Sequence, residues 1–458
     1  MFWALIASPA VAYVAFVVNG ILPAYSDAFA TSSWLGSFVV ASIVACLGVN
    51  YAVSLLGMLL CGVPRPQNER NVKLLGEQGW SSDKTLIFCF VSQGIQQKVL
   101  KHSVSEAIRV AQRHGVRFQV EVVVDTEIPS DPFFVEQGCE VISVPPWFVT
   151  PKGSRFKARA LYYATLERKA RNANCGNTWV VHCDEDTVLT DAAIAGIQKF
   201  IERPDSGSAC GAGEIKYNLT PLLNSNLFSV ADYHRTGEDL GRFRFQYSAF
   251  KAALFGAHGS FLVVPALVEE QVQFDFGPQG SIAEDIYFAF RLREMSVPCN
   301  WIEGYVREQS PQNLRNFLTQ RARWINGLLN SCMDPRIPLM NRLLLLSYLA
   351  MLRVTVVVGI VPLLLLFITG FDACLLSLWS LASMVIGTNL LVGTVRNAEE
   401  DCHGLSFKTL ISIVGVLFVI PVVCFVETIA VVYGLLFRSD EFLVVQKANI
   451  FEVRAHAG

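Results

Sequence analysis

Long apolar stretches lie near both ends of this 458-residue sequence and enclose a more polar region. A helix needs about 20 apolar residues to cross a bilayer, and five stretches reach that length: 2–25, 34–63, 342–369, 371–395 and 409–437. The pattern predicts two transmembrane helices within 1–64, a domain over 65–340, about three transmembrane or interfacial helices within 341–438 and a tail over 439–458.

Basic residues indicate which side of a membrane the central domain would face. Arg65, Arg70 and Lys73 follow the second apolar stretch directly, whereas the joint near Gly370 carries no Lys or Arg. Because positively charged loops remain on the cytosolic side, we expect a cytosolic domain. We expect a multi-pass integral membrane protein that is located in the ER or Golgi, or in the plasma membrane.

Within the central region, short apolar runs alternate with segments of helical periodicity. The expected strands are Thr85–Val91, Arg117–Val124, Val141–Val144 and Thr178–Cys183, and the expected helices are Lys98–Gly115, Arg155–Arg171, Ile286–Glu294 and Gln312–Leu329. This alternation predicts an α/β, doubly wound domain. Ligands bind beyond the carboxyl ends of the strands in such domains, where Ser92, Asp125 and Asp184 stand.

Composition narrows the class of protein. Hydrophobic residues make up 52% and charged residues 17% of the sequence, and the mean hydropathy is +0.40, which fits a membrane protein with one substantial soluble domain. The net charge of -2 provides no basic field, so nucleic acid is not an expected partner. The 12 cysteines are scattered and are interpreted as reduced thiols.

Three polar signals follow one another in the central region: Asp184-Glu185-Asp186, Glu284-Asp285 and Gln320-Arg321-Ala322-Arg323-Trp324. A nucleotide-sugar glycosyltransferase needs carboxylates for a divalent cation on a diphosphate, a separate carboxylate as a base, and a cationic or aromatic element that closes the site. Each signal has a structural alternative, namely a solvated loop, the cap of a helix and a tryptophan that packs on the membrane surface. The order and spacing of the set favour the enzyme.

These motifs, together with Asp125, resemble the inverting family 2 glycosyltransferases, whose membrane members include cellulose, chitin and hyaluronan synthases. A narrower resemblance is to the Egghead-type β-1,4-mannosyltransferases. It rests on Phe156-Lys157-Ala158-Arg159-Ala160-Leu161, Gly280-Ser281-Ile282-Ala283-Glu284-Asp285, Ile302-Glu303-Gly304 and Val444-Val445-Gln446-Lys447, and on Ala231-Asp232, Arg235, Asp239–Gly241 and Gly259-Ser260. It spans about Thr85 to Lys447. The sequence has Ser92-Gln93-Gly94 where the family has Thr-Arg-Gly, and Asp186 where it has Glu.

The resemblance implies a nucleotide-sugar-binding, GT-A-like domain inserted between transmembrane helices, with Mg²⁺ or Mn²⁺ as cofactor. It implies that Asp184 and Asp186 bind the metal, that Asp285 is the general base and that Glu284 supports it. The implied donor-binding residues are Ser92, Gln93, Asp125, Lys157, Arg159, Asp184, Gln320, Arg321 and Arg323. The implied acceptor-binding residues are Gly259, Ser260 and Trp324. Alternatively, Asp125 caps a turn, and Lys157 and Arg159 lie on a solvated helix face.

The resemblance implies transfer of mannose from GDP-mannose to a β-linked acceptor, a glycolipid such as glucosylceramide or an oligosaccharide. One alternative is a processive synthase that makes a β-linked mannan or glucan from a nucleotide sugar, and another is an inactive membrane scaffold. The complete acidic set argues against the scaffold, and the small number of spans favours the glycolipid. Arg353 and Glu427 are costly within apolar stretches. They either line an acceptor path or pair between helices.

Overall fold

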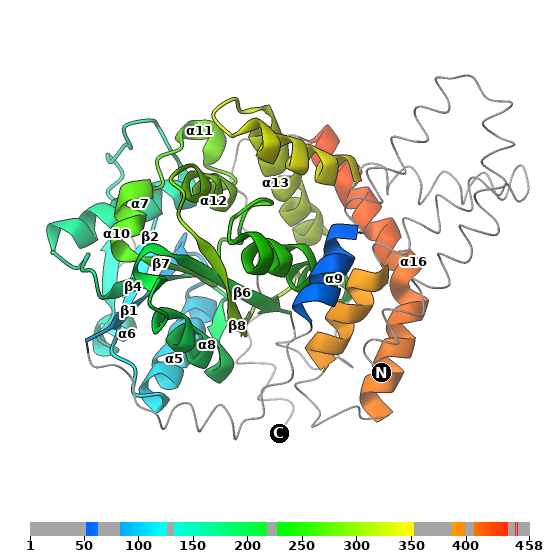
Figure 1. The fold of residues 1–458 in the computed structure, drawn as a ribbon, viewed down its shortest axis with the longest axis horizontal. Helices are drawn as coiled ribbons and strands as arrows, with labels where there is room; N and C mark the ends of the chain where they lie inside the picture. Colours follow the sequence, from blue (N-terminus) through cyan, green and yellow to red (C-terminus); the bar gives the residue numbers. More distant parts are fainter. Residues whose placement is uncertain are drawn as a thin grey trace, which may run out of the picture.

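The computed structural model describes residues 52–62, 83–125, 132–217, 227–351, 387–398, 407–437, 445 and 447. One eight-stranded sheet in the order β3-β2-β1-β4-β7-β6-β8-β5 forms its centre (Figure 1). The strands are β1 (Thr85–Ser92), β2 (Phe118–Val124), β3 (Glu140–Ser143), β4 (Thr178–Asp184), β5 (Val188–Leu189), β6 (Cys210–Lys216), β7 (Leu262–Pro265) and β8 (Cys299–Arg307).

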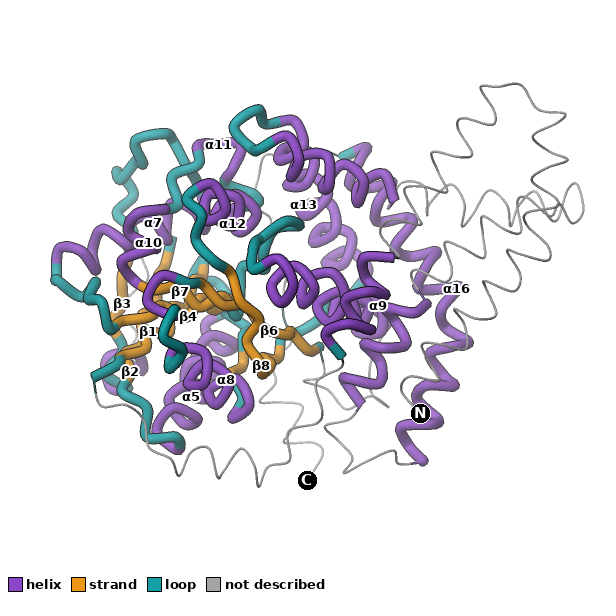
Figure 2. Tube along the Cα trace, viewed as in Figure 1, coloured by secondary structure: helices purple, strands orange, loops and turns teal. Residues whose placement is uncertain are grey.

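Helices cover the sheet and continue beyond one of its edges (Figure 2). They are α5 (Gln97–Arg113), α6 (Pro132–Glu136), α7 (Phe156–Ala170), α8 (Asp191–Ile201), α9 (Leu227–Glu238), α10 (Ala266–Val272), α11 (Gly277–Gly280), α12 (Glu284–Glu294), α13 (Leu314–Met333) and α16 (Phe407–Leu436). Two π-helical turns, Asp239–Phe243 and Gln246–Phe250, follow α9. Residues 52–61, 339–351 and 387–398 are also helical.

The predicted elements are confirmed, with small shifts at their ends. The largest of these shifts affect two helices of the site. Helix α12 begins at Glu284 rather than at Ile286, and α13 runs from Leu314 to Met333 rather than from Gln312 to Leu329. The α/β class is confirmed as well, and the sheet of the predicted doubly wound domain is mixed in strand direction. Strands β3, β2, β1 and β4 are parallel, whereas β7 runs antiparallel to β4 and to β6. Hydrophobic periodicity carries no information on strand direction, so the sequence pattern did not reveal this mixed sheet.

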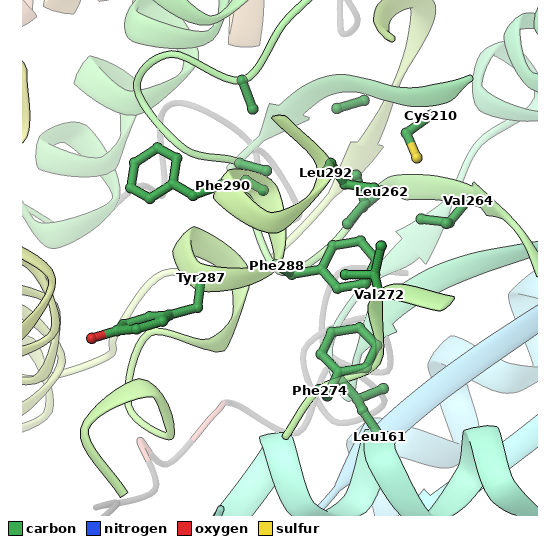
Figure 3. Packing of buried hydrophobic residues seen from close by; sticks show 14 of the residues in the cluster. Leu161, Cys210, Leu262, Val264, Val272, Phe274, Tyr287, Phe288, Phe290 and Leu292 are labelled. Carbon is green, nitrogen blue, oxygen red and sulfur yellow. The ribbon is translucent and has the colours of Figure 1, made fainter. Parts of the chain in front are cut away.

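Apolar side chains on both faces of the sheet form the core. Strand β1 sends Phe88 to the face covered by α5 and Ile87 to the face covered by α7. Burial of both faces explains why these strands are nearly continuous apolar runs. On the second face the rings of Phe274 and Phe288 stack with centroids 4.5 Å apart (Figure 3). This packing fixes α12, and with it the acidic pair at its start.

Beyond the β6 and β8 side of the sheet, α9, α13, α16 and helical residues 52–61 and 387–398 lie together (Figure 1). Glycines permit the close contacts: a Cβ on Gly57 would lie 2.0 Å from the Gly241 carbonyl oxygen, and one on Gly393 would lie 1.7 Å from that of Tyr233. Residues 407–436 form one continuous helix.

The predicted membrane spans are only partly within the described residues. The span over 2–25 lies outside them, and those over 34–63, 342–369 and 371–395 lie partly outside. In the ranges that the structure describes, no helix has both the length and the apolar composition that a membrane crossing requires. The domain limits at 64/65, 340/341 and 438/439 stay predictions.

Candidate active site

Three neighbouring strands bring the first predicted residues together. Ser92 ends β1, Asp184 ends β4, and Asp125 follows β2, which pairs with β1. A cavity of about 360 Å³ opens at this edge of the sheet. The predicted site residues that line it are Ser92, Gln93, Asp125, Lys157, Asp184, Asp186, Gly259, Ser260, Glu284, Asp285, Gln320, Arg321, Arg323 and Trp324. The expected convergence at the carboxyl ends of the strands is therefore confirmed.

Arg159 is the one predicted site residue that does not line this cavity. Its Nε donates a hydrogen bond to Asp125 Oδ1 at 2.9 Å, and its Nη2 donates to the Asp125 carbonyl oxygen at 2.8 Å. Burial raises the pKa of Asp125, while the Arg159 guanidinium opposes that rise. Arg159 thus holds Asp125 in position.

Lys157 joins the two acidic motifs. Its Nζ lies 2.5 Å from Asp184 Oδ1 and 3.4 Å from Glu284 Oε1, and it donates to the Gly259 carbonyl oxygen at 3.1 Å. Burial alone would lower the pKa of Lys157, but the carboxylates of Asp184 and Glu284 raise it above its ordinary value. The interpretation of Lys157 as part of a solvated helix face is wrong, since its side chain is only 12% exposed.

Glu284 and Asp285 occupy the first turn of α12 and also line the cavity. The backbone N–H of Ile286 donates to Asp285 Oδ1 at 2.8 Å. Burial raises the pKa of Glu284 to about 7 and raises that of Asp285, while Lys157 opposes both rises. A carboxylate whose pKa lies closer to neutrality is a more effective general base at the pH of the cell.

Gly259 brings the backbone close to these carboxylates. A Cβ at this position would lie 2.8 Å from Lys157 Nζ and 3.6 Å from Asp285 Oδ2, so any larger side chain would displace the lysine. The neighbouring Ser260 is buried, and its hydroxyl donates to Glu308 Oε1. Glycine here lets Lys157 reach the carboxylates without being displaced.

The acidic side chains of Asp184-Glu185-Asp186 have different hydrogen-bond partners. Glu185 accepts hydrogen bonds from Ser92 Oγ and Gln96 Nε2, both at 2.7 Å, and burial raises the pKa of Glu185 to about 7. Asp186 Oδ2 accepts from Lys447 Nζ at 2.7 Å and from the backbone N–H of Gln309 at 3.0 Å. The interpretation of this triplet as a solvated loop is wrong.

Asp184 and Asp186 have the chemistry that a divalent cation requires. Burial raises the pKa of Asp184, but the Lys157 ammonium outweighs it and holds that pKa below its ordinary value, so the side chain is a carboxylate. Hard carboxylate oxygens suit Mg²⁺ or Mn²⁺. The described ranges hold no group of three or more His, Cys, Asp and Glu side chains placed around one metal position. Both carboxylates are paired with ammonium groups, Asp184 with Lys157 at 2.5 Å and Asp186 with Lys447 at 2.7 Å.

The motif on α13 divides its side chains between the cavity and the helices behind it. Arg321 donates to Glu427 on α16 and to Asp232 on α9. The guanidinium carbon of Arg321 lies 4.5 Å from the Trp324 ring centroid, and that of Arg235 lies 4.1 Å from it. Arg323 lines the cavity, where the carboxylates of Glu284 and Asp184 are near enough to raise its pKa, although burial lowers it overall.

Several cavity residues were not assigned a role from the sequence. Glu308 is buried, and burial together with Asp186 raises its pKa to about 7. His258 Nε2 lies 2.5 Å from Asp239 Oδ1. Lys447, which entered only through the family resemblance, reaches Asp186 from far along the chain. Isolated residues have no spacing that a pattern could detect, so only tertiary contact brings them into the site.

The mixed sheet and the carboxylate cavity define a glycosyltransferase with a GT-A-like α/β architecture. The family described as glycosyl transferase family group 2 matches residues 179–393. The chain is 32% identical over 371 residues to the β-1,4-mannosyltransferase bre-3 of Caenorhabditis elegans, covering 78% of each chain. It is 33% identical over 337 residues to the β-1,4-mannosyltransferase egh of Drosophila melanogaster, covering 72% of this chain and 70% of that one. The protein belongs to glycosyl transferase family group 2.

A solved structure of mannosyl-3-phosphoglycerate synthase from Rubrobacter xylanophilus matches 57% of this chain and 77% of its own, at 13% identity and a TM-score of 0.35.

Proposed function

We propose that this enzyme transfers mannose from GDP-mannose to a β-linked glycolipid acceptor such as glucosylceramide, forming a β-1,4 bond with inversion. The relatives named β-1,4-mannosyltransferase, which match most of the chain, support the sugar and the linkage. One observation carries the chemistry: Lys157 lies between the donor-side carboxylate Asp184 and the acidic pair on α12, with hydrogen-bond and ion-pair distances of 2.5 and 3.4 Å.

In this reaction the acceptor hydroxyl loses its proton to Asp285, and its oxygen forms a bond to C1 of mannose. The bond from C1 to the donor phosphate oxygen breaks on the opposite side, and GDP leaves with the bonding electron pair. Because entry and departure are in line, the anomeric centre inverts. Glu284 shares the buried environment and supports the base.

The remaining residues bind and orient the substrates. Arg323 and Gln320 face the leaving diphosphate, and Asp125 contacts the nucleoside. Asp184 and Asp186 would hold Mg²⁺ or Mn²⁺, which would neutralise charge on the leaving group. Trp324 contacts the acceptor sugar with its indole, and its two neighbouring guanidiniums fix the ring.

The test is a donor screen on purified protein with glucosylceramide and β-mannooligosaccharides as acceptors, followed by determination of the product linkage. We expect GDP-mannose to be preferred and glucosylceramide to receive one β-1,4-mannose. A ladder of lengthening chains would identify a processive synthase instead. Transfer of a different sugar would contradict the proposed donor.

We also propose that the protein is a multi-pass protein of the ER or Golgi membrane, or of the plasma membrane, with the catalytic domain in the cytosol. Exposed apolar side chains along α16, including Phe418 and Leu436 at 81% and 71% exposure, support a lipid neighbour. A glycosylation acceptor engineered near Gly370 should be modified in sealed microsomes. Modification at sites engineered within 65–340 instead would reverse the orientation.

A further inference from the structure

The imidazole of His258 lines the cavity beside the acidic pair of α12, and the proposed reaction gives it no role. A Cβ on the adjacent Gly259 would lie 3.6 Å from Asp285 Oδ2, so the backbone at this point passes close to the proposed base. Burial raises the pKa of Asp285, and the charges of Lys157 and His258 are near enough to oppose that rise. His258 therefore lies next to the position at which the acceptor hydroxyl loses its proton.

Asp239 determines how the His258 ring is oriented. Its Oδ1 lies 2.5 Å from His258 Nε2, and its Oδ2 accepts a hydrogen bond from the backbone N–H of Ile215 at 2.9 Å. Asp239 is only 1% exposed, so its carboxylate faces the ring rather than solvent. A carboxylate accepts hydrogen bonds and does not donate them, and therefore Nε2 carries a hydrogen and donates it to Asp239.

Two π-helical turns hold the ring and its loop in place. Asp239 and Phe243 are the first and last residues of one turn, and the Phe243 ring lies against the imidazole with centroids 4.4 Å apart. In the second turn, Gln246 Nε2 donates to the Gly256 carbonyl oxygen at 2.9 Å, two residues before His258. π-Helical turns are rare and occur frequently at functional sites. Here one of them supplies both a hydrogen-bond acceptor and an aromatic contact to the same imidazole.

The second ring nitrogen of His258, Nδ1, is accessible from the cavity. Among the described residues the imidazole has one hydrogen-bond partner, Asp239, which it contacts through Nε2. The side chain is 17% exposed, and Nδ1 is not enclosed by protein atoms, unlike the buried and unpartnered Nε2 of His234. Nδ1 accepts a hydrogen bond in the neutral ring and donates one in the charged ring. A hydroxyl group both donates and accepts, so it matches either state.

We propose that His258, oriented by Asp239, binds a second hydroxyl of the acceptor sugar while Asp285 deprotonates the attacking one. The inference rests on the proposed function, in which the attacking hydroxyl of glucose is the one on C4. Its neighbours on the sugar are the hydroxyls of C3 and C6, so two adjacent side chains of the cavity wall can hold two adjacent hydroxyls. Such a contact aligns the attacking oxygen. It also selects against sugars that lack the second hydroxyl, because Nδ1 is then left without a partner.

The first experiment measures kcat/KM of the full-length enzyme with GDP-mannose for a short-chain glucosylceramide and for its 3-deoxy and 6-deoxy forms. For one of the two deoxy acceptors, the wild type should show a kcat/KM that is lower by about tenfold or more. Similar use of all three acceptors would overturn the inference alone. Absence of transfer to all of them would contradict the proposed function, and the inference with it.

Two histidines provide a matched comparison. His258 and His234 both line the cavity, both are 17% exposed, and each lies beside a carboxylate. Gln at position 258 reaches Asp239 but has no polar atom at the position of Nδ1, so His258→Gln should reduce the ratio between parent and deoxy acceptor to less than about twofold. His234→Gln should leave this ratio unchanged. Because each ratio is taken within one preparation, partial misfolding cancels, and equal ratios in the two variants would overturn the proposal.

A third variant and a binding measurement separate contact with the sugar from a structural role. His258→Asn places an amide at the position of Nδ1 and should keep more of the ratio than His258→Gln. The Kd for GDP in Mn²⁺ should stay at the wild-type value in both variants, because the contact is with the acceptor. A loss of GDP binding as large as the loss of kcat/KM, or a smaller ratio in His258→Asn than in His258→Gln, would assign His258 a structural role and overturn the proposal.

Discussion

The guanidinium of Arg321 forms an ion pair with the carboxylate of Glu427. Arg321 Nε donates to both carboxylate oxygens of Glu427, at 3.0 and 3.1 Å, and Arg321 Nη2 donates to one of them at 2.7 Å. This contact joins α16 to α13 directly behind the catalytic motif. Of the two hypotheses for Glu427, pairing between helices is confirmed, with Arg321 as the partner, and Glu427 also lines the cavity. Arg353 lies outside the described residues.

Loss of this ion pair should impair turnover. Glu427→Gln leaves the buried Arg321 with Asp232 as its charged partner, and Arg321 is in contact with Trp324. Because a small displacement of a positioning group lowers rates strongly, we expect kcat to fall by about tenfold or more. Binding of the nucleotide, measured by calorimetry, should change little.

The matched control is Glu303→Gln. Glu303 pairs with Arg244 at 2.7 Å, and its side chain is exposed to a similar degree, 38% against 32% for Glu427. This pair lies outside the cavity lining. Equal effects of the two substitutions on kcat would mean that Glu427 contributes only general stability.

Substitution of Asp285, the proposed general base, should abolish transfer. Asn at position 285 retains the shape of the side chain but cannot accept the proton, so we expect kcat to fall by about 10²-fold or more. Nucleotide binding should stay close to that of the wild type. Glu294→Gln, at the far end of α12, serves as the control. Near-normal turnover of Asp285→Asn would exclude it as the base.

Removal of the cation or of its ligands should weaken donor binding. Asp184→Ala and Asp186→Ala should each raise the Kd for GDP in Mn²⁺ by at least about tenfold, since the diphosphate charge then lacks its counter-charge. Asp191→Ala, which removes a carboxylate paired with Arg113 on the surface, should leave the Kd unchanged. Full activity of the wild type in excess chelator would contradict a metal requirement.

The dependence of kcat on pH should report the buried acidic pair. Asp285 acts as a carboxylate and burial raises its pKa, so activity should be lost as the pH falls through that raised pKa. Lys157 lowers the pKa values of Asp285 and Glu284, and therefore Lys157→Met should move the acidic limb to higher pH. Lys169→Met, at an exposed lysine of the same helix, should not move it. An unshifted limb in Lys157→Met would contradict this coupling.

Much of the site was predictable because its residues lie in local patterns. Asp184 ends a buried apolar strand, Glu284 begins a helix, and both features can be recognised from the order of residue types. The strand order β2-β1-β4 follows from parallel crossovers, which explains why Ser92 and Asp125 converge with Asp184 as expected. The family resemblance added the roles of these residues.

Other parts depended on contacts between distant segments. The partner of Glu427 is 106 residues away, and Lys447 reaches Asp186 across 261 residues. The antiparallel direction of β7 likewise has no local signal in the sequence. The same is true of the contact between the Arg321 guanidinium and the Trp324 ring.

By itself the sequence determined the α/β class, the acidic and basic motifs of the transferase, and the strand ends at which they would meet. These properties depend on periodicity and on residues a few positions apart, which the chain encodes locally. Only the tertiary structure decided the mixed sheet, the position of Lys157 between Asp184 and Glu284, and the ion pair between Glu427 of α16 and Arg321. These features depend on how helices from distant segments pack, and that packing is settled by the burial of the whole core rather than by any single stretch of sequence.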